Sequence, residues 1–481
     1  MTAKTIMVQG TSSGVGKSLV AMALCRHFKR KGFKTSPFKS QNMSLNSAVS
    51  VEGGEMARSQ YIQAIAAGAA PSVKMNPILL KPETGGSQII LMGKVFDRVT
   101  AKDYMMSKKI KLFETSLASL NELIELNDVV VIEGAGSPAE INLKKKDIVN
   151  MKIAKAIKAP VILVVDIERG GAFAQIVGTM ELLDDEEKEL VIGYMFNKFV
   201  GDPSLLDDYP KRIAKRYGIE FLGTMPKLEH KIPEEDSMFS WHSQKKGDVN
   251  VDIVKLPHIS NFDDFDVLRW NENVRFVEND LKGDLIIIPG TKETIEDLRW
   301  LKKRGIFERI LEAKREGTTI MGICGGYQIL GRTLKDVKSG KKEEGFGFLP
   351  VETTFNEEKK NTNVLKGIEN LFGTTIEGYE IHQGITTCLE DVKPFSFVNS
   401  VNGEKISYEE GVITENVLGT YFHGLFKNVD FTENFLNSIR SKKGISSKPV
   451  KMWSLTDEID KFTDTFEKHV NIEFIERKMG I

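Results

Sequence analysis

Short apolar runs alternate with longer amphipathic stretches over most of the chain. The runs that predict buried strands are residues 4–9, 33–39, 129–132, 160–166 and 191–197 in the first half, and 251–256, 284–288, 318–323 and 417–421 in the second. Nearly every position in these runs is apolar, which is typical of parallel strands covered on both faces. Helical patterns such as 17–31 and 172–183 lie between the runs. This alternation predicts an α/β protein with two doubly wound sheets.

The alternation stops at a polar segment, residues 226–249, which contains two prolines and no clear apolar period. We interpret this segment as a linker, with a short helix at 233–244. It would separate a first domain at 1–225 from a second domain at 250–440. The charged end of the chain has a helical period, so residues 441–481 are expected to form a C-terminal helical tail.

Composition narrows the class of protein further. At roughly 150 residues per domain, 481 residues suggest two to four domains. Lys and Arg number 66 and Asp and Glu 67, so the basic surplus typical of proteins that bind nucleic acid or membranes is missing, and neither partner is expected. The apolar runs are far shorter than the ~18 residues of a membrane span. Three cysteines cannot form a disulfide framework, and residues 1–10 lead into a strand without a signal-peptide pattern. We expect a cytoplasmic protein.

A phosphate-binding loop is predicted at residues 10–18, Gly-Thr-Ser-Ser-Gly-Val-Gly-Lys-Ser, between a strand and a helix. Gly14 and Gly16 let the backbone N–H groups approach an anion at the N-terminus of the helix. Lys17 would face the β- and γ-phosphates of ATP, and the Ser18 hydroxyl would ligate Mg²⁺. The alternative is a glycine-rich turn with an incidental Lys-Ser pair.

Polar residues follow three other strands of the first half. Glu133 is expected to be a second Mg²⁺ ligand, the alternative being a loop acid without that role. Asp166 could ligate a metal or cap the next helix. Arg169 could hold a substrate carboxylate or be a surface charge. Asn197 could read the edge of adenine, as an ATP-binding residue, or cap its strand.

A nucleophile elbow is predicted in the second half, at residues 318–331, where a strand runs through Cys324 into a helix. Small neighbours allow the sharp turn, and the helix N-terminus favours the thiolate. The backbone N–H of Gly325 could form half of an oxyanion hole, with Gly290 in the loop after strand 284–288 supplying the other half. An inert buried cysteine is the alternative, and Cys25 and Cys388, which lack such a context, are interpreted as structural.

A base for this thiol is expected at His423, which directly follows strand 417–421 and could reach Cys324 across one sheet edge. A core histidine is the alternative interpretation. His382 either lines the site where the two halves meet or packs in the core.

Both motifs resemble known families. The loop at 10–18 and the Glu-Gly-Ala-Gly strand end at 133–136 resemble the dethiobiotin synthetase-type ATPases, which implies a P-loop domain that makes acyl phosphates on carboxylates. The order of Cys324, a glycine-rich turn and His423 resembles class I glutamine amidotransferases. Those usually carry Glu two residues after the histidine. Here Leu425 stands there, so the orienting acid is missing from its place.

The two halves together specify a glutamine-dependent amide ligase that uses ATP, Mg²⁺ and L-glutamine as co-substrate. Cys324 would attack the side-chain amide of glutamine to give a thioester and ammonia. The other half would phosphorylate a substrate carboxylate, and ammonia would displace the phosphate.

A more specific resemblance covers almost the whole chain, from residue 5 to about 440. Its segments are similar, in order, to the cobyric acid synthase family: 38–47, 76–88, 166–175, 257–266, 287–292, 378–384 and 419–426. The resemblance implies amidation of the b, d, e and g carboxylates of the corrinoid adenosylcobyrinic acid a,c-diamide to adenosylcobyric acid, in cobalamin biosynthesis. Asn42, in the first of these segments, is expected to contact the substrate, as is Arg169.

Other functions remain as alternatives. One is a cobyrinate a,c-diamide synthase or another glutamine-dependent polyacid amidase. Another is a regulatory P-loop ATPase with an inactive amidotransferase domain, against which the intact pair of Cys324 and His423 argues. Whether the chain forms a homo-oligomer is left open.

Overall fold

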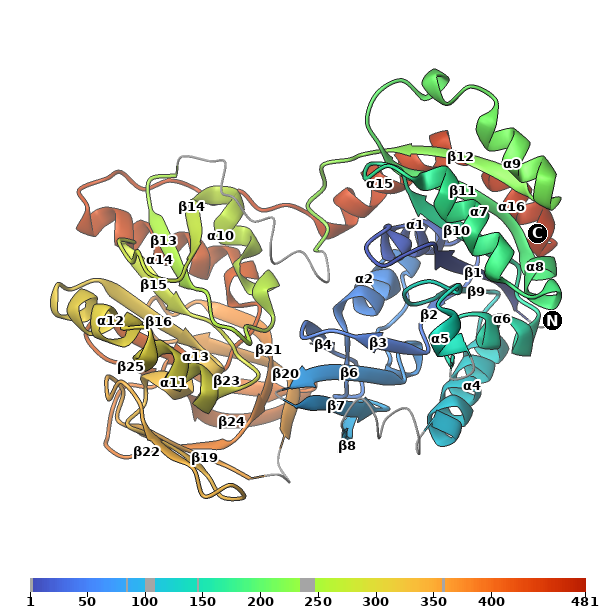
Figure 1. Cartoon of the computed structure of the whole chain (residues 1–481). Coiled ribbons are helices and arrows are strands. Elements are labelled where there is room, and N and C mark those ends of the chain that lie inside the picture. Colours follow the sequence, from blue (N-terminus) through green and yellow to red (C-terminus); the bar gives the residue numbers. More distant parts are fainter. Residues whose placement is uncertain (1–2, 84, 100–108, 145–146, 234–246, 357–359) are drawn as a thin grey trace. The chain divides into compact units, whose positions relative to one another are not determined.

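The computed structural model describes residues 3–83, 85–99, 109–144, 147–233, 247–356 and 360–481 (Figure 1). The chain divides into two compact units, each of which contains a six-stranded sheet that is wholly or mainly parallel. The first unit comprises residues 1–44, 56–232 and 453–481, and the second comprises 45–55 and 233–452. The predicted α/β fold with two doubly wound sheets is confirmed. The helix expected at 233–244 lies, apart from residue 233, outside the described residues.

The central sheet of the first unit has the strand order β12-β11-β10-β1-β9-β2, and all neighbours are parallel. Its strands are β1 (Lys4–Gly10), β2 (Thr35–Phe38), β9 (Val129–Glu133), β10 (Val161–Asp166), β11 (Val191–Phe199) and β12 (Glu220–Pro226). After β1 the chain continues to β2, which lies beyond β9 on one side of β1 in the sheet. The strand on the other side of β1 is β10. The carboxyl ends of β1, β9 and β10 therefore form the switch point at which open α/β sheets bind ligands.

Helices connect these strands. They are α1 (Lys17–Arg30), α2 (Arg58–Ala67), α4 (Lys109–Leu126), α5 (Ile141–Lys144), α6 (Met151–Ile157), α7 (Ala172–Leu182), α8 (Asp185–Leu190) and α9 (Tyr209–Tyr217), with 3₁₀ turns η1 (Val73–Met75) and η2 (Pro203–Leu206). Alternate side chains of β1 point to opposite faces of the sheet and pack into two separate hydrophobic cores. Ile6 and Val8 belong to one core, and Met7 belongs to the other. Both faces are covered, so the strand is apolar at nearly every position.

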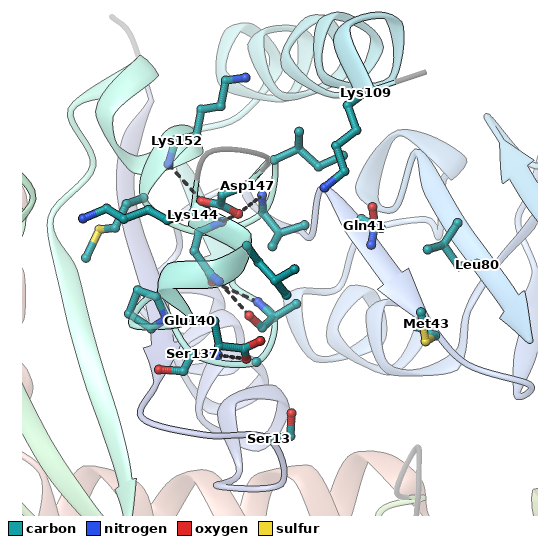
Figure 2. Close-up of a pocket in the computed structure, with 18 of the residues that line it drawn as sticks. Ser13, Gln41, Met43, Leu80, Lys109, Ser137, Glu140, Lys144, Asp147 and Lys152 are labelled. Atoms are coloured by element: carbon teal, nitrogen blue, oxygen red, sulfur yellow. Dashed lines mark hydrogen bonds between the residues drawn. The ribbon is translucent and has the colours of Figure 1, made fainter. Parts of the chain in front are cut away.

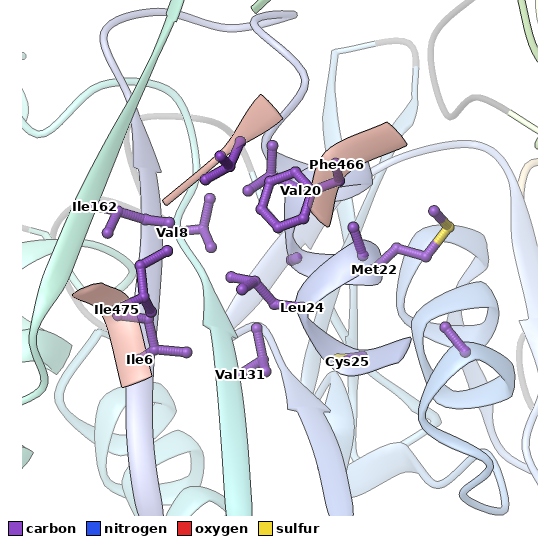
Figure 3. Close-up of a cluster of buried hydrophobic side chains, with 14 of the residues drawn as sticks. Ile6, Val8, Val20, Met22, Leu24, Cys25, Val131, Ile162, Phe466 and Ile475 are labelled. Carbon is purple, nitrogen blue, oxygen red and sulfur yellow. The ribbon is translucent and has the colours of Figure 1, made fainter. Parts of the chain in front are cut away.

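The end of the chain completes one of these cores (Figure 3). Helices α15 (Leu455–His469) and α16 (Ile472–Met479) contribute Phe466 and Ile475, which are fully buried in the same cluster as Val8. The polar side of the tail faces α1, where the two ring nitrogens of His27 lie 2.8 Å from a Glu467 oxygen and 2.9 Å from a Glu476 oxygen. The tail thus packs as part of the first unit.

A smaller sheet, β3-β6-β7-β8, also belongs to the first unit. Its strands are β3 (Gln41–Met43), β6 (Ile78–Glu83), β7 (Gly86–Leu91) and β8 (Lys94–Val99). A two-stranded pair, β4 (Ser47–Val49) with β5 (Glu55–Ala57), follows β3 in sequence. These strands are short or exposed on one side, so they lack the continuous apolar run by which the buried strands are recognised.

The second unit is built on the sheet β14-β13-β15-β16-β26-β25, which is parallel except for β25. Its strands are β13 (Asn250–Val254), β14 (Asn273–Val277), β15 (Leu285–Ile288), β16 (Thr319–Ile323), β25 (Val412–Ile413) and β26 (Val417–Thr420). Its helical segments are η3 (Phe262–Phe265), α10 (Asp266–Asn271), α11 (Thr294–Lys303), α12 (Ile306–Arg315), α13 (Gly325–Leu330), η4 (Leu425–Lys427) and α14 (Val429–Lys442). The strand order brings the carboxyl ends of β15, β16 and β26 together.

Two further four-stranded sheets lie in this unit. The sheet β18-β17-β19-β22 contains β17 (Thr333–Asp336), β18 (Lys342–Glu344), β19 (Val351–Phe355) and β22 (Ile385–Cys388), and the sheet β21-β20-β23-β24 contains β20 (Lys360–Glu369), β21 (Thr375–Gln383), β23 (Ser396–Val401) and β24 (Glu404–Glu410). Among the described residues, no helix combines the length and apolar character that a membrane span requires.

Candidate active site

The predicted phosphate loop connects β1 to α1, and its shape depends on glycine. Gly14 and Gly16 have φ angles of 73° and 97°, in the left-handed region that favours glycine. A Cβ on Gly16 would also lie 2.2 Å from Nδ2 of Asn197. That amide donates a hydrogen bond of 2.8 Å to the carbonyl of Val15. The end of β11 therefore holds the loop in its cradle conformation.

Lys17 is directed across this loop. Its Nζ donates to the carbonyls of Ser12 at 2.9 Å and Gly136 at 3.0 Å, and the residue is only 7% exposed. Burial, reinforced by the nearby charge of Lys39, lowers the pKa of Lys17 to about 8. The ammonium has lost water without gaining a direct carboxylate partner among the described residues. A bound polyphosphate would supply the missing negative charge.

Glu133, at the end of β9, is the centre of the polar contacts beside the loop. Its carboxylate accepts hydrogen bonds from Ser18 Oγ and Lys39 Nζ, both 2.8 Å, and from the side-chain amides of Gln60 at 2.9 Å and Gln63 at 2.6 Å. Burial alone would raise the pKa of Glu133, but the charge of Lys39 and these hydrogen bonds lower it. The carboxylate is thus held ionised, beside the predicted phosphate position.

This donor set fits Mg²⁺. The cation takes oxygen ligands and, at phosphates, needs only one or two from the protein. Glu133 and Ser18, the two predicted ligands, lie within hydrogen-bond distance of each other. Over the part of the chain that the structure describes, no group of three or more His, Cys, Asp or Glu side chains is arranged for a metal. A Mg²⁺ site shared with a nucleotide does not require such a group, because the phosphates supply further oxygen ligands.

Sequence reasoning missed Lys39, Gln60 and Gln63. Lys39 directly follows β2, whose neighbour in the sheet is β9, so its position at a strand end was a usable signal. The two glutamines lie on α2, and nothing in their spacing relates them to Glu133.

The remaining predicted residues of the first unit show structural contacts. Asp166 caps the turn before α7, because its Oδ1 accepts the backbone N–H of Glu168 at 2.9 Å. Arg169 is exposed in the same turn. Asn42 is buried, and its amide donates to Gln60 Oε1 at 2.9 Å. The adenine role of Asn197 and the substrate roles of Arg169 and Asn42 stay predictions.

In the second unit, Cys324 lies on a sharp turn between β16 and α13. Its φ of 54° is unusual for a residue other than glycine, and such strain is typical of functional sites. The turn also requires small neighbours, because a Cβ on Gly326 would come within 1.9 Å of the carbonyl of Ile288. The thiol donates to the carbonyl of Ile381 at 3.5 Å. This is the predicted elbow geometry, with the thiol at the N-terminus of a helix.

The structure places His423 beside this thiol, as predicted. His423 follows β26, which is the neighbour of β16, and it is fully buried and hydrogen-bonded to Cys324. Its Nδ1 lies 2.6 Å from Oδ2 of Asp264. Burial alone would lower the pKa of His423, but the charge of Asp264 and the contact with Cys324 raise it to about 10. The imidazole is therefore cationic at neutral pH and in contact with the sulfur of Cys324.

Asp264 supplies the acid that the sequence analysis found missing. Leu425, at the usual position of the acid, is buried in η4. Asp264 comes instead from η3, after β13, and its second oxygen accepts the N–H of Gly424 at 2.7 Å. The signal that could have found it is a run of acids among aromatic residues at 262–266, in the segment that follows β13, the strand beside β15.

The predicted oxyanion-hole residues lie around the same pair. A Cβ on Gly290 would be 3.1 Å from Cε1 of His423, and one on Gly325 would be 3.0 Å from the backbone N of Thr291. The loop after β15 thus contacts both the histidine and the elbow. The arrangement is compatible with two N–H donors at one oxyanion, and that role stays a prediction.

The other candidates, His382, Cys25 and Cys388, lie in different surroundings. His382 stacks on Tyr421, with ring centroids 3.6 Å apart, and its Nε2 lies 3.2 Å from Oε2 of Glu380. Cys25 is buried in the core of the first unit, where burial raises the pKa of its thiol, and Cys388 is exposed on β22.

Replacing Asp264 with Asn is expected to lower kcat for glutamine hydrolysis by about 10²- to 10⁴-fold, because the imidazole loses its orienting carboxylate. The carboxylate raises the pKa of His423, so its removal lowers that pKa. The imidazolium is then lost at lower pH, and the alkaline limb of the pH–rate profile for glutamate release moves to lower pH.

Asp263→Asn is the matched control, since Asp263 carries the same group one residue away but contacts Lys427 at 3.1 Å. An unchanged pH profile in Asp264→Asn would show that this carboxylate does not act on His423.

Comparisons with known proteins assign each half of the chain to a described family. Residues 6–238 match the family described as the CobQ/CobB/MinD/ParA nucleotide binding domain, and residues 250–431 match the CobB/CobQ-like glutamine amidotransferase domain. A Thermococcus kodakarensis protein named "Probable cobyric acid synthase" is 52% identical, over 99% of this chain and 100% of its own length. Proteins named "Cobyric acid synthase" from Dehalococcoides mccartyi and Clostridium botulinum are each 45% identical, over 98% and 99% of both chains respectively.

One chain thus contains a phosphate cradle in its first unit and a cysteine–histidine–aspartate triad in its second. The similarity extends over nearly the full length of relatives that share one name. The chain belongs to the cobyric acid synthase family and is a glutamine-dependent amidating ligase.

Proposed function

We propose that the chain amidates the b, d, e and g side-chain carboxylates of adenosylcobyrinic acid a,c-diamide to give adenosylcobyric acid, in cobalamin biosynthesis. The observation that carries this proposal is the triad of Cys324, His423 and Asp264 in the same chain as the Lys17 cradle. The similarity to named relatives supports the corrinoid substrate. The three free cysteines, with no disulfide among them, support the cytoplasm as the compartment.

The glutaminase half begins with the thiolate of Cys324, which attacks the side-chain carbonyl carbon of glutamine. Negative charge develops on the carbonyl oxygen, where the N–H groups of Gly290 and Gly325 would stabilise it. His423, already protonated, gives its proton to the leaving nitrogen, and ammonia departs. The neutral imidazole then takes a proton from water, which attacks the thioester and releases glutamate and the thiolate.

In the ligase half, an oxygen of the corrinoid carboxylate attacks the γ-phosphorus of ATP, and ADP leaves. Ammonia then attacks the carbonyl carbon of the acyl phosphate, phosphate departs, and the amide forms. Lys17 and Lys39 would stabilise charge on the transferred phosphoryl group, since both ammonium groups lie at the loop. Ser18 and Glu133 would hold Mg²⁺, which supplies further charge neutralisation at the phosphates when bound.

The test is amidation by the purified chain with ATP, glutamine and corrinoid acids, followed by mass spectrometry of the products. We expect the a,c-diamide to gain four amides, with one ADP and one glutamate formed per amide. Turnover of cobyrinic acid but not of its a,c-diamide would favour an a,c-diamide synthase. ATP hydrolysis without glutaminase activity would favour the regulatory ATPase.

A further inference from the structure

Residues 45–55 interrupt the sequence of the first unit and pack in the second unit. They follow β3, whose Gln41 and Met43 line a cavity of about 780 Å³ in the first unit (Figure 2). The segment contains β4, which packs against β20 and β21, and every residue from 46 to 50 is buried. A buried segment in this place can fix side chains of the glutaminase half.

One side chain that this segment fixes is Asn261, which lies directly before η3 and is only 2% exposed. Its φ of 52° lies in the left-handed region, which asparagine enters more readily than most residues. The backbone N–H of Ser47 donates to Oδ1 of Asn261 at 3.2 Å. A backbone N–H can only donate, so this contact determines which end of the amide is the oxygen and directs the nitrogen to the other side.

That nitrogen lies beside the histidine of the triad. Nδ2 of Asn261 is 3.4 Å from Nε2 of His423, whereas Asp264 contacts Nδ1. An amide nitrogen carries two N–H groups and accepts no hydrogen bond. It therefore has no hydrogen bond to offer a protonated Nε2, but it can donate to the lone pair of Nε2 in the neutral ring. The distance is long for a hydrogen bond, as expected while both nitrogens carry protons.

We propose that Asn261 is a positioning residue of glutamine hydrolysis, whose amide donates to Nε2 of His423 once that nitrogen has given its proton to the departing ammonia. The inference rests on the proposed roles of Cys324 and His423. At that stage the sulfur of Cys324 is bonded to the glutamyl carbon and has no proton to donate, so the amide supplies the hydrogen bond. A long hydrogen bond is weak, and water can replace it when the imidazole acts as a base.

Asn261 thus acts on the ring in the opposite sense to Asp264. The titratable side chains that the structure places against the imidazole come from three elements: Asp264 of η3, Cys324 of the elbow and Tyr379 of β21. The ring of Tyr379 stacks on it, with centroids 5.2 Å apart. The nearby charges of η3 and η4, Asp263 and Lys427, lie 3.1 Å from each other, and the loop after β15 approaches through the uncharged Gly290. Asp264 and Cys324 favour the cation, whereas a donor at Nε2 favours the neutral ring.

The test uses two variants that keep the left-handed backbone. Asn261→Gly removes the amide, and glycine adopts a positive φ without strain. Asn261→Asp keeps the shape and the acceptor for Ser47 but places an oxygen at Nε2, so it carries the test if the glycine variant does not fold. Asn402→Gly is the matched control. Asn402 also has a positive φ, of 50°, and also accepts a backbone N–H, from Val364 at 2.8 Å, but it lies in the turn between β23 and β24.

The first measurement is the pKa of His423, by ¹⁵N NMR of histidine-labelled protein, with the signal assigned by its loss in His423→Gln. All variants carry Cys324→Ala, because Cys324 raises the pKa of His423 and its removal brings the titration to lower pH. Asn261→Gly should raise this pKa by about 0.5 to 1 unit, because a donor to the neutral ring is lost. Asn261→Asp should raise it by about 1 to 2 units, because a carboxylate accepts from the protonated ring. Asn402→Gly should leave it unchanged.

The second measurement compares two substrates with Cys324 intact. Asn261→Gly should lower kcat/KM for glutamine about 3- to 10-fold, which is the rise in proton affinity expressed as a rate. The γ-glutamyl p-nitrophenyl ester loses a phenolate that needs no proton, so its kcat/KM should stay at the wild-type value. An amide with a purely structural role would affect both substrates equally.

An unchanged or lowered pKa of His423 in Asn261→Gly and Asn261→Asp would overturn the inference, as would an equal loss with glutamine and with the ester. Failure of the proposed function is seen separately, as hydrolysis of glutamine that persists in Cys324→Ala. That result would overturn this inference too, since His423 would then not serve the reaction.

Discussion

Replacing Cys324 with alanine is expected to abolish glutamine-dependent amidation, by about 10⁴-fold or more, while amidation from added ammonia persists. The substitution removes the sulfur atom that forms the thioester in the proposed mechanism. It leaves the phosphate loop of the other unit unchanged. Ammonia-dependent activity should rise with pH, because the neutral amine is the nucleophile. The measurement is amide formation by mass spectrometry, with glutamine or with ammonium salts as nitrogen source.

Cys388→Ala is the control for this experiment, because Cys388 is an exposed thiol that has no histidine partner among the described residues. It should keep wild-type rates with both nitrogen sources. Normal glutamine use by Cys324→Ala would show that the nucleophile lies elsewhere. Loss of the ammonia reaction as well would show that the thiol is needed for amide formation itself.

Replacing Lys17 with alanine is expected to lower amidation about 10²- to 10³-fold with either nitrogen source, because acyl-phosphate formation loses a preorganised charge. The pKa of Lys17 is lowered to about 8 in the free protein, so the ammonium is lost as pH rises through that value. ATP binding by the wild type should therefore weaken above about pH 8, and this dependence should be absent in Lys17→Ala. Isothermal titration with a nonhydrolysable ATP analogue, repeated over a range of pH, measures ATP binding by the wild type and by Lys17→Ala.

Lys198→Ala separates charge from loop structure in this experiment. Lys198 donates to the carbonyl of Gly14 at 2.6 Å, so it supports the loop from outside the cradle. We expect a smaller effect on ATP binding than in Lys17→Ala. Full amidation activity in Lys17→Ala would overturn the phosphate cradle, and an equal loss in both variants would assign the effect to loop structure.

The sequence predicted the elements that carry the chemistry because their signals are local. A strand, a glycine-rich turn and a helix follow one another within residues 4–30, and again within 318–331. Lys17 and Cys324 are each placed by the turn in which they occur. The apolar runs also identified most strands of the two central sheets, since β1 and its neighbours bury both faces. They did not identify β12 and β14, whose burial is interrupted by partly exposed positions.

Other features could not be predicted because their signals are not local. Asp264 and His423 are 159 positions apart in sequence, and only the order β13-β15-β16-β26 brings their loops to one sheet edge. The expectation of an acid two residues after His423 fails at Leu425, because the hydrogen-bonding position at Nδ1 can be reached from another loop. The antiparallel strands, with one face exposed, gave no continuous apolar run.

By itself, the sequence determined the fold class. It also predicted the phosphate loop and the pair of Cys324 and His423 and, through resemblance to known families, an amide ligase that uses ATP and glutamine. The tertiary structure decided which distant groups complete each site: Lys39 and two glutamines at Glu133, and Asp264 at His423. It also decided that the C-terminal helices close a core begun by β1 and α1. The physical reason is that a turn fixes the residues within it, whereas burial and hydrogen bonding between distant segments depend on how the strands are ordered in the sheet.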